Sequence, residues 1–199
     1  HNKIYGYSAT IGDGGIAQLR RSSGAGAYVI VFSVAYWTKK NLDINGNSLC
    51  GGMQSNAGIT YNCSFHHCSG TGFNSTGATE VIINSASYNN TSTGFHFGAY
   101  ITNSISYNNS INGIYGFRNV EKCVAQNNSN FGISLSGLGC ITNSICDGNG
   151  VKGIDVLSDA VIMNCVIRNQ FTGTGLYFNA SGDRGNFVSN INIYNCTTT

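Results

Sequence analysis

Two nearly identical segments 19 residues apart decide the fold: IINSASYNN (residues 82–90) and ITNSISYNN (residues 101–109). Related segments precede and follow them, so the chain aligns with itself on one column of small residues. That column contains Asn41, Cys63, Ser85, Ser104, Cys123, Ser144, Cys165 and Cys196. The steps between these positions are 22, 22, 19, 19, 21, 21 and 31 residues, and we expect an insertion around residues 181–187 to loop out of the last copy. A nearly constant step predicts stacked, equivalent coils.

Asparagine recurs on both sides of the small column. It stands directly before the column at Asn62, Asn84, Asn103, Asn143, Asn164 and Asn195, and four residues after it at Asn45, Asn89, Asn108, Asn127 and Asn169. Asn tolerates left-handed turns, and its amide can bond an identical amide in the next coil. We therefore expect turns with asparagine ladders at these two columns.

Short alternating segments follow a glycine nine residues after the small column, as in GFHF (94–97) and GISL (132–135). Alternation of this kind predicts strands with one buried face. The residues expected to point inward are Phe73, Phe95, Ile114, Ile133, Ile154 and Leu176, together with Phe97, Leu135, Val156 and Phe178. The repeats thus predict an all-β chain, a right-handed parallel β-helix solenoid of about eight coils of 19–22 residues over residues 28–199, after an N-terminal segment of residues 1–27.

The composition excludes several classes of protein. Charged residues make up only 9% of the 199 residues, and the formal net charge is +2. This charge is too small for a nucleic-acid footprint, so we expect no nucleic-acid partner. No apolar run approaches the roughly 18 residues of a membrane span, so we expect no membrane partner. Instead, 27 Gly and 27 Asn give the chain a neutral polar character.

The repeated patterns I-x-N-S/C-x-x-x-N and G-I/F-x-Φ, where Φ is apolar, resemble those of the pectate-lyase-like superfamily of right-handed parallel β-helices. This superfamily includes polysaccharide lyases, pectin-degrading hydrolases and phage tailspikes. The resemblance covers about residues 28–199, and IYGYSATIGDGG (4–15) looks like the stretch that leads into the first coil. The chain departs from the enzymes of the superfamily, because the NTD, DD, HG and RIK motifs of the hydrolases are absent. The proline-containing arginine motif of the lyases is excluded, since the chain has no Pro.

Eight cysteines raise the question of disulfides. Those in the small column, Cys63, Cys123, Cys165 and Cys196, are expected to be buried free thiols. The other four, Cys50, Cys68, Cys140 and Cys146, leave one or two bridges open. There is no CxxC pair, and His66-His67 beside Cys68 is a weak zinc signal, so we predict neither a metal site nor a cofactor.

Only eight carboxylates are available for acid–base chemistry, and most lie in different parts of the repeat. The one suggestive cluster is late in the chain, where Asp147 and Arg168 occupy the same column in neighbouring coils and Asp155 and Asp159 are close in sequence. If the chain is an enzyme, Asp147, Asp155 and Arg168 are the candidate catalytic residues of a polysaccharide lyase or glycosidase. The alternative is a surface ion pair.

The strands also predict an outward row that could bind a glycan: Asn74, His96, Tyr115, Ser134, Asp155 and Tyr177. Aromatic rings flanked by amide, hydroxyl and carboxylate groups suit an extended sugar chain. A second row of similar character is formed by His66, Tyr88, Tyr107, Gln126, Asp147 and Arg168. An ordinary polar sheet face is the alternative for both rows.

These observations favour a non-catalytic β-helix module of an extracellular or virion-surface protein, such as a tailspike or fibre. It would act as a rigid structural spacer that recognises polysaccharide along one face. A polysaccharide lyase or glycoside hydrolase is one alternative, and a purely structural homo-oligomeric assembly protein is another. Open coil ends expose a core and unpaired strand edges, so we expect neighbouring domains or subunits to cover them.

Overall fold

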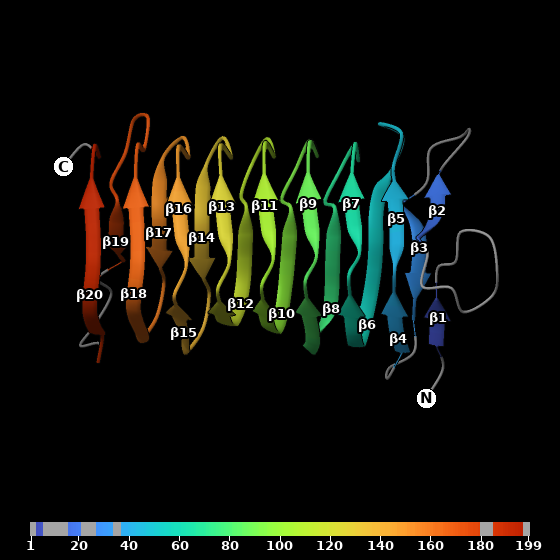
Figure 1. Cartoon of the computed structure of the whole chain (residues 1–199), viewed down its shortest axis with the longest axis horizontal. Coiled ribbons are helices and arrows are strands. Elements are labelled where there is room, and N and C mark those ends of the chain that lie inside the picture. The colour runs from blue at the N-terminus through green and yellow to red at the C-terminus, as the bar shows by residue number, and fades with distance from the viewer. Residues whose placement is uncertain (1–2, 6–15, 21–26, 34–36, 180–184, 197–199) are drawn as a thin grey trace.

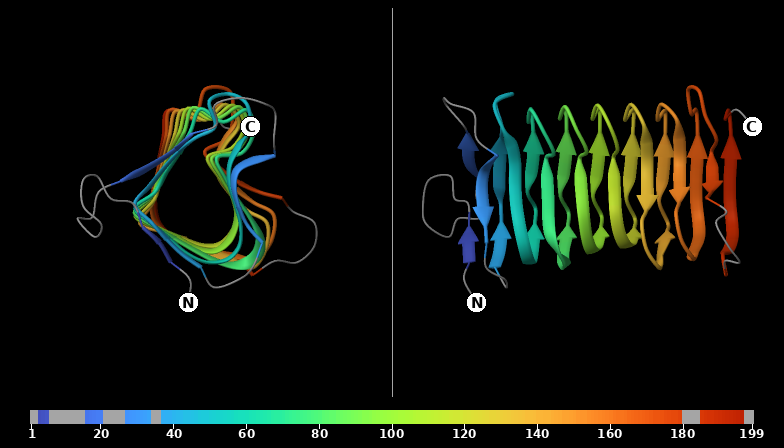
Figure 2. Two further views of the ribbon diagram at one scale, coloured as in Figure 1. Left: turned by 90° about the vertical axis from the view of Figure 1, so that its right-hand side faces the viewer. Right: turned by 180° about the vertical axis from the view of Figure 1, so that it is seen from behind.

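The computed structural model describes residues 3–5, 16–20, 27–33, 37–179 and 185–196. Within these ranges it contains twenty β-strands and no helix, and the strands pair in parallel with their equivalents in the next coil. Figures 1 and 2 show the result, an elongated stack of coils with a three-sided cross-section. The chain forms a right-handed parallel β-helix of about seven turns, close to the eight coils expected. No helix in the described ranges has the length and hydrophobicity that crossing a bilayer requires.

Three parallel sheets form the sides of the coil, and the longer strands bend from one sheet into the next. Sheet 1 contains β3 (Tyr28–Phe32), β14 (Phe131–Leu135), β17 (Lys152–Val156), β19 (Leu176–Phe178) and the first parts of β6 (Gly51–Tyr61), β8 (Phe73–Ile83), β10 (Phe95–Thr102) and β12 (Ile114–Glu121).

Sheets 2 and 3 complete the coil. Sheet 2 contains β1 (Lys3–Tyr5), β4 (Trp37–Lys40), β15 (Gly139–Thr142), the later parts of β6, β8, β10 and β12, and the first parts of β18 (Ala160–Arg168) and β20 (Phe187–Tyr194). Sheet 3 contains β2 (Ala17–Arg20), β5 (Leu42–Asn45), β7 (Ser64–His66), β9 (Ala86–Tyr88), β11 (Ile105–Tyr107), β13 (Val124–Gln126), β16 (Ile145–Asp147) and the last parts of β18 and β20. Strands β1 and β2 thus pair within the solenoid, while residues 6–15 of the IYGYSATIGDGG segment and residues 181–184 of the expected insertion lie outside the described residues.

The turn from sheet 2 into sheet 3 is made by one residue in the left-handed conformation. Eight residues take φ between 49° and 56° there: Asn41, Asn62, Asn84, Asn103, Lys122, Asn143, Asn164 and Asn190. Asn adopts this conformation at little cost because its short side chain bonds locally. The asparagine column directly before the small residues is therefore a turn column, as the sequence predicts.

The buried asparagine ladder lies one residue later than the column we expected. Asn89, Asn108, Asn127 and Asn169 are exposed and take the left-handed turn out of sheet 3. The next residues bond one another inside the coil, with Nδ2 to Oδ1 distances of 2.9–3.0 Å along Asn90, Asn109, Asn128 and Asn149. The glycine column makes room for this ladder, because a Cβ at Gly113 would lie 2.7 Å from Asn128 Nδ2.

The register corrects the alignment of the two terminal copies. Asp43 pairs with Ser64, which places Leu42 rather than Asn41 opposite Cys63. Ile191 pairs with Cys165, so the last step is 26 residues and Cys196 does not belong to the small column. The error arose because Asn-Cys at 195–196 imitates the repeated Asn-Ser/Cys pair at a place where the chain has already left sheet 3.

The inward positions of the strands build one continuous apolar core. Phe73, Phe95, Ile114, Ile133, Ile154, Leu135 and Val156 are buried as predicted, and Leu176 and Phe178 pack against the core at its end. Phe97 is the exception: its side chain is 39% exposed, and the inward position in β10 passes to Gly98, which pairs with the buried Phe117. The alternation fails there because Phe97 takes a left-handed φ of 55°.

A polar network interrupts the core in the first coils. Lys39 and Glu80 are fully buried, with Nζ 2.7 Å from Oε1. Ser55 and Thr60 each donate a hydrogen bond to the Glu80 carboxylate. Because both charges are paired and hydrogen-bonded, the interior can hold them. This pair could not be predicted, since both residues look like ordinary surface charges in the sequence.

All eight cysteines are free thiols, so none of the four outside the small column forms a bridge. Six are buried, and Cys140 and Cys196 are half-buried. Burial raises the pKa of Cys63 to about 11 and that of Cys68 and Cys123 to about 12. A thiol with such a pKa stays protonated and unreactive near neutral pH.

Candidate functional site

The six residues of the predicted outward row occupy neighbouring register positions on sheet 1. Asn74 pairs with His96, His96 with Tyr115, and Tyr115 with Ser134, and the row continues through Asp155 to Tyr177. Period-2 alternation was sufficient to find this alignment, because these strands share one register.

Two residues in the second half of this row are not accessible, whereas Tyr177 at its end is 38% exposed. Ser134 is fully buried and Asp155 is 2% exposed. Lys152 lies over them, with Nζ 2.7 Å from Asp155 Oδ1 and 3.6 Å from the centroid of the Tyr177 ring. The expectation of one continuous exposed stripe was therefore wrong, because a long cationic side chain from the start of β17 covers part of it. Apart from Tyr177, the accessible part lies around His96 and Tyr115.

The three candidate catalytic residues do not form one site. Arg168 Nε lies 2.9 Å from Asp147 Oδ2 on sheet 3, and Arg168 also donates to the Tyr194 hydroxyl at 3.1 Å. Asp155 lies on sheet 1 beneath Lys152. Proximity in sequence was misleading, because the seven residues between Asp147 and Asp155 contain the turn from one sheet to another.

A groove of about 410 Å³ opens beside the accessible part of the row, where sheet 1 turns into sheet 2. Its lining residues are Ser75, Thr76, Gly77, Phe97, Gly98, Gly116, Arg118, Ser136 and Gly137. The two 19-residue coils contribute Phe97, Gly98, Gly116 and Arg118, and the longer coils on either side contribute the remaining residues. Coil length thus explains the groove, because the short coils are recessed between longer ones. The steps of 19 between 22 and 21 were the sequence signal for this site, and we did not interpret them as a groove.

Phe97 forms an aromatic surface within the groove. Its left-handed φ is costly for a residue with a bulky side chain, and such strain is concentrated at functional sites. The ring contacts Gly116 of the next coil, where an added Cβ would lie 2.4 Å from Phe97 Cδ1. His96 and Tyr115 lie beside it, with ring centroids 4.2 Å and 5.8 Å from that of Phe97. The groove therefore offers an exposed ring supported by two others.

The amide of Asn74 sets the tautomer of His96. Asn74 Nδ2 donates to the Tyr28 hydroxyl at 2.9 Å, so its Oδ1 is left to accept from His96 Nδ1 at 2.8 Å. The second ring nitrogen, Nε2, then carries a lone pair. Burial lowers the pKa of His96 below its ordinary value, which keeps the imidazole neutral near pH 7. His96 thus has the form of a hydrogen-bond acceptor or base.

Arg118 supplies the positive charge of the groove. Its side chain is exposed, and no hydrogen bond or ion pair joins it to another described residue. No Asp or Glu is found among the described lining residues. The groove can therefore bind an anionic or hydroxyl-rich ligand, but it lacks the paired carboxylates of a glycosidase.

The second predicted row differs in the direction that its rings face. His66, Tyr88 and Tyr107 stack in parallel along sheet 3, with centroids 4.9 Å apart and interplanar angles of 4–5°. Their faces contact one another, so mainly ring edges remain for a ligand. A further groove of about 300 Å³ at the corner of sheets 2 and 3 is lined by Ile16, Leu42, Asn62, Cys63, Ser64, Asn84, Ser85, Ala86, Asn103 and Ile105, and offers neither an aromatic ring nor a charge.

Comparison with known proteins identifies the fold. No protein-family model and no curated protein matches the sequence. Among solved structures, the A-module of the mannuronan C-5 epimerase AlgE4 of Azotobacter vinelandii superposes with a TM-score of 0.62 over 81% of this chain, at 12% identity. Pectate lyase Pel9A gives 0.61 over 89% at 14% identity, and a mutant of the periplasmic alginate epimerase AlgG gives 0.54 over 85% at 11% identity. This chain shares their parallel β-helix fold. It spans 61%, 66% and 47% of those three chains.

Proposed function

We propose that the chain is a polysaccharide-recognition module of an extracellular or virion-surface protein, and that the glycan binds in the groove around Phe97. One observation carries the proposal: a bulky aromatic residue is held in a strained conformation with its ring exposed in a concave site. Sugar rings stack on such faces, and His96, Tyr115 and Arg118 supply polar partners around it. The proteins of similar fold are named for action on mannuronan, pectate and alginate, which are polysaccharides.

The groove predicts how the glycan lies. Its walls come from coils three steps apart, which is about 14 Å at a strand spacing of about 4.8 Å. A single sugar chain fits between such walls and would run parallel to the strands, at a right angle to the helix axis, whereas the predicted row of side chains follows that axis. Ser134 and Asp155 are buried and interrupt the row along the axis, which supports this orientation.

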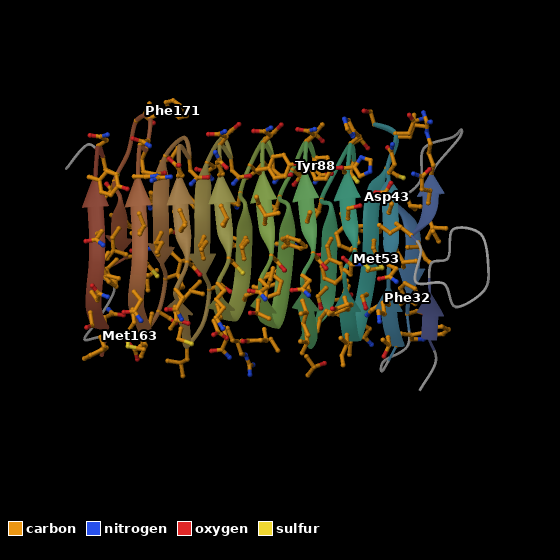
Figure 3. All side chains as sticks on the ribbon, in the orientation of Figure 1. Phe32, Asp43, Met53, Tyr88, Met163 and Phe171 are labelled. Carbon is orange, nitrogen blue, oxygen red and sulfur yellow. The ribbon has the colours of Figure 1, made fainter. Side chains whose placement is uncertain are left out.

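Substitution of Phe97 by Gly tests the proposal. Glycine accepts a left-handed φ without strain, so Phe97→Gly should keep the free energy of unfolding within about 1 kcal/mol of the wild type. Affinity for oligosaccharides of pectate, alginate or mannuronan, measured by calorimetry, should fall at least about tenfold, because the stacking surface is lost. The matched control is Phe171→Ala, which removes a 72% exposed phenylalanine outside the groove (Figure 3). Equal binding by wild type and Phe97→Gly would disprove the assignment.

A second candidate function, a lyase or epimerase acting on the same glycans, is favoured by His96. Its fixed tautomer and neutral state suit a base that takes the proton from the carbon next to a sugar carboxylate, while Arg118 offsets the charge of that carboxylate. Incubation with each polysaccharide should then give unsaturated products or inverted residues by NMR, and His96→Gln should abolish them. Binding of the polysaccharide without any product would favour recognition over catalysis.

A purely structural role in an assembly is the remaining alternative, in which side faces bury against copies of the chain. Solution mass tests it directly. A defined oligomer without affinity for any glycan would favour this role over recognition.

A further inference from the structure

A pair of histidines on sheet 3, far from the groove, has a geometry that the proposed function does not use. His66 ends β7, and His67 follows in the exposed left-handed turn where other coils carry Asn89, Asn108 and Asn127. His66 Nδ1 and His67 Nδ1 lie 2.7 Å apart, and their ring planes are nearly perpendicular at 82°. The two Nδ1 atoms therefore face each other at hydrogen-bond distance.

Asp43 determines which nitrogen of His66 is available. Its Oδ1 lies 2.9 Å from His66 Nε2 and also accepts a hydrogen bond from Ser64. A proton on Nε2 donates to this carboxylate, which leaves the lone pair on Nδ1. This arrangement of carboxylate, histidine and open nitrogen is the one that surrounds metal-ligating histidines in general.

Packing fixes the His66 ring in this orientation. The ring is largely buried and stacks on Tyr88 with centroids 4.9 Å apart and an interplanar angle of 4°. Asp43 and Tyr88 come from the coils on either side of β7 and lie toward the same edge of the molecule (Figure 3). His67 is exposed and can turn about its side-chain bonds, so the second ligand adjusts to the first.

We propose that His66 and His67 bind a divalent transition-metal ion, with Cu²⁺ the preferred one, and that solvent completes its coordination. At metal–nitrogen distances of about 2.0–2.1 Å, two ligands at a right angle lie about 2.9 Å apart and two at a tetrahedral angle about 3.3 Å. The 2.7 Å between the two nitrogens is a hydrogen-bond distance, and a turn of the exposed His67 ring that widens it to about 2.9 Å gives the right angle that belongs to the tetragonal geometry of Cu²⁺ or Ni²⁺. Cu²⁺ also heads the general order of affinities for such ligands.

Cys68, which lies beside the two histidines in the sequence, is not part of the site. Cys68 is buried, and its thiol donates to the His66 carbonyl on the inner side of the turn. In the part of the chain that the structure describes, no group of three or more His, Cys, Asp or Glu side chains gathers around one point. The site is thus a two-histidine surface site, and its affinity depends on both imidazoles.

Copper titration of the full chain tests the proposal. All samples carry His1→Ala, so that the imidazole of His1 does not compete for Cu²⁺. We expect one equivalent of Cu²⁺ by calorimetry and an electron paramagnetic resonance spectrum with two equatorial nitrogens. His67→Asn keeps a residue suited to the left-handed turn, and its dissociation constant for Cu²⁺ should rise at least about tenfold.

Two further variants distinguish ligand loss from misfolding. Asp43→Asn should weaken Cu²⁺ binding by about tenfold if the carboxylate orients His66. His96→Gln removes an imidazole from sheet 1 and should bind Cu²⁺ like its parent. The proposal is wrong if His67→Asn binds Cu²⁺ as tightly as the parent, or if the parent does not bind Cu²⁺. The contact between His66 and His67 would then be only a hydrogen bond between two imidazoles. Neither result affects the groove, which lies on another face.

Discussion

The outer faces of sheets 1 and 3 carry similar residues but differ in how regularly they repeat. On sheet 3 the row of His66, Tyr88 and Tyr107 follows one register from coil to coil, and the rings stack in parallel. On sheet 1 the register shifts after His96, and the three rings of the site meet at angles of 24–70°. The regular face has its aromatic rings packed on one another, whereas the irregular face has a ring exposed beside a groove.

This difference shows what irregularity contributes to a repeat protein. Identical coils stack into flat ladders whose side chains satisfy one another, which gives stability. A change of three residues in coil length recesses part of the surface and strains Phe97. We therefore expect substitutions in the regular columns to affect mainly stability, and substitutions at the irregular corner to affect mainly binding.

The largest effect is expected from Asn109→Ala, in the buried ladder. Asn109 Nδ2 donates to Asn128 Oδ1 at 2.9 Å and its Oδ1 accepts from Asn90 Nδ2 at 2.9 Å, so its loss removes hydrogen bonds to both neighbouring coils and leaves the Asn90 backbone N–H, which donates to Asn109 Oδ1 at 3.2 Å, unpaired. At about 1–3 kcal/mol for each such group, the free energy of unfolding in urea should fall by about 3 kcal/mol or more. Asn108→Gly is the control, because that exposed left-handed position should change stability by less than about 0.5 kcal/mol.

A smaller effect is expected from Gly116→Ala, at the irregular corner. Gly116 has a φ of 81°, and an added Cβ would lie 2.4 Å from the Phe97 ring. Strain and displacement of the ring should lower stability by about 1–2 kcal/mol and also weaken glycan binding. Gly137→Ala is the matched control, since a Cβ there meets nothing within 4 Å and thermal unfolding should be unchanged. Equal melting temperatures of the two variants would contradict the packing of Phe97 on Gly116.

The fold was predictable because the same local sequence pattern recurs in each coil. Period-2 alternation placed Phe95, Ile114 and Ile133 in the core, and Asn before the small column marked the turn. The ladder was misplaced by one residue because in Asn108-Asn109 both residues have the same identity, and only the turn geometry decides which one points inward. Sequence could not resolve that choice.

The candidate site was predictable only in part. Register brought His96 and Tyr115 together as expected, but Phe97 was assigned to the core. The alternation of apolar and polar residues does not reveal that one residue within a strand is left-handed. The covering of Asp155 by Lys152 could not be predicted either, because it depends on where one flexible side chain lies. The groove depends on differences in length between coils, whereas the alignment of the repeats emphasises what the coils have in common.

Tyr107→Ala compares the two faces directly. Its ring stacks on Tyr88 with centroids 4.9 Å apart, and loss of such a pair should cost about 0.5–1.5 kcal/mol beyond the buried area. Glycan affinity should be unchanged, whereas Tyr115→Ala on sheet 1 should reduce it. A titration of both variants with the same oligosaccharide checks this, and a loss of affinity in Tyr107→Ala would place binding on the regular face instead.

The smallest effect concerns the pH dependence of stability at His96. Because burial lowers the pKa of this imidazole in the folded state, the folded chain binds fewer protons than the unfolded chain once the pH falls below about 6.5, the ordinary value for His. The contribution of His96 to stability is therefore complete above that pH and is lost as the pH falls through the folded-state pKa. Urea unfolding at pH 7.5, 6.5 and 5.5 should show that the wild type loses more stability than His96→Gln as the pH falls. The other titratable groups are the same in both proteins, so they do not contribute to the difference between the two free energies of unfolding. If the stabilities of wild type and His96→Gln change equally with pH, His96 is as hydrated in the folded chain as a free imidazole. His96 would then have no reason to be neutral near pH 7 and to act as a base.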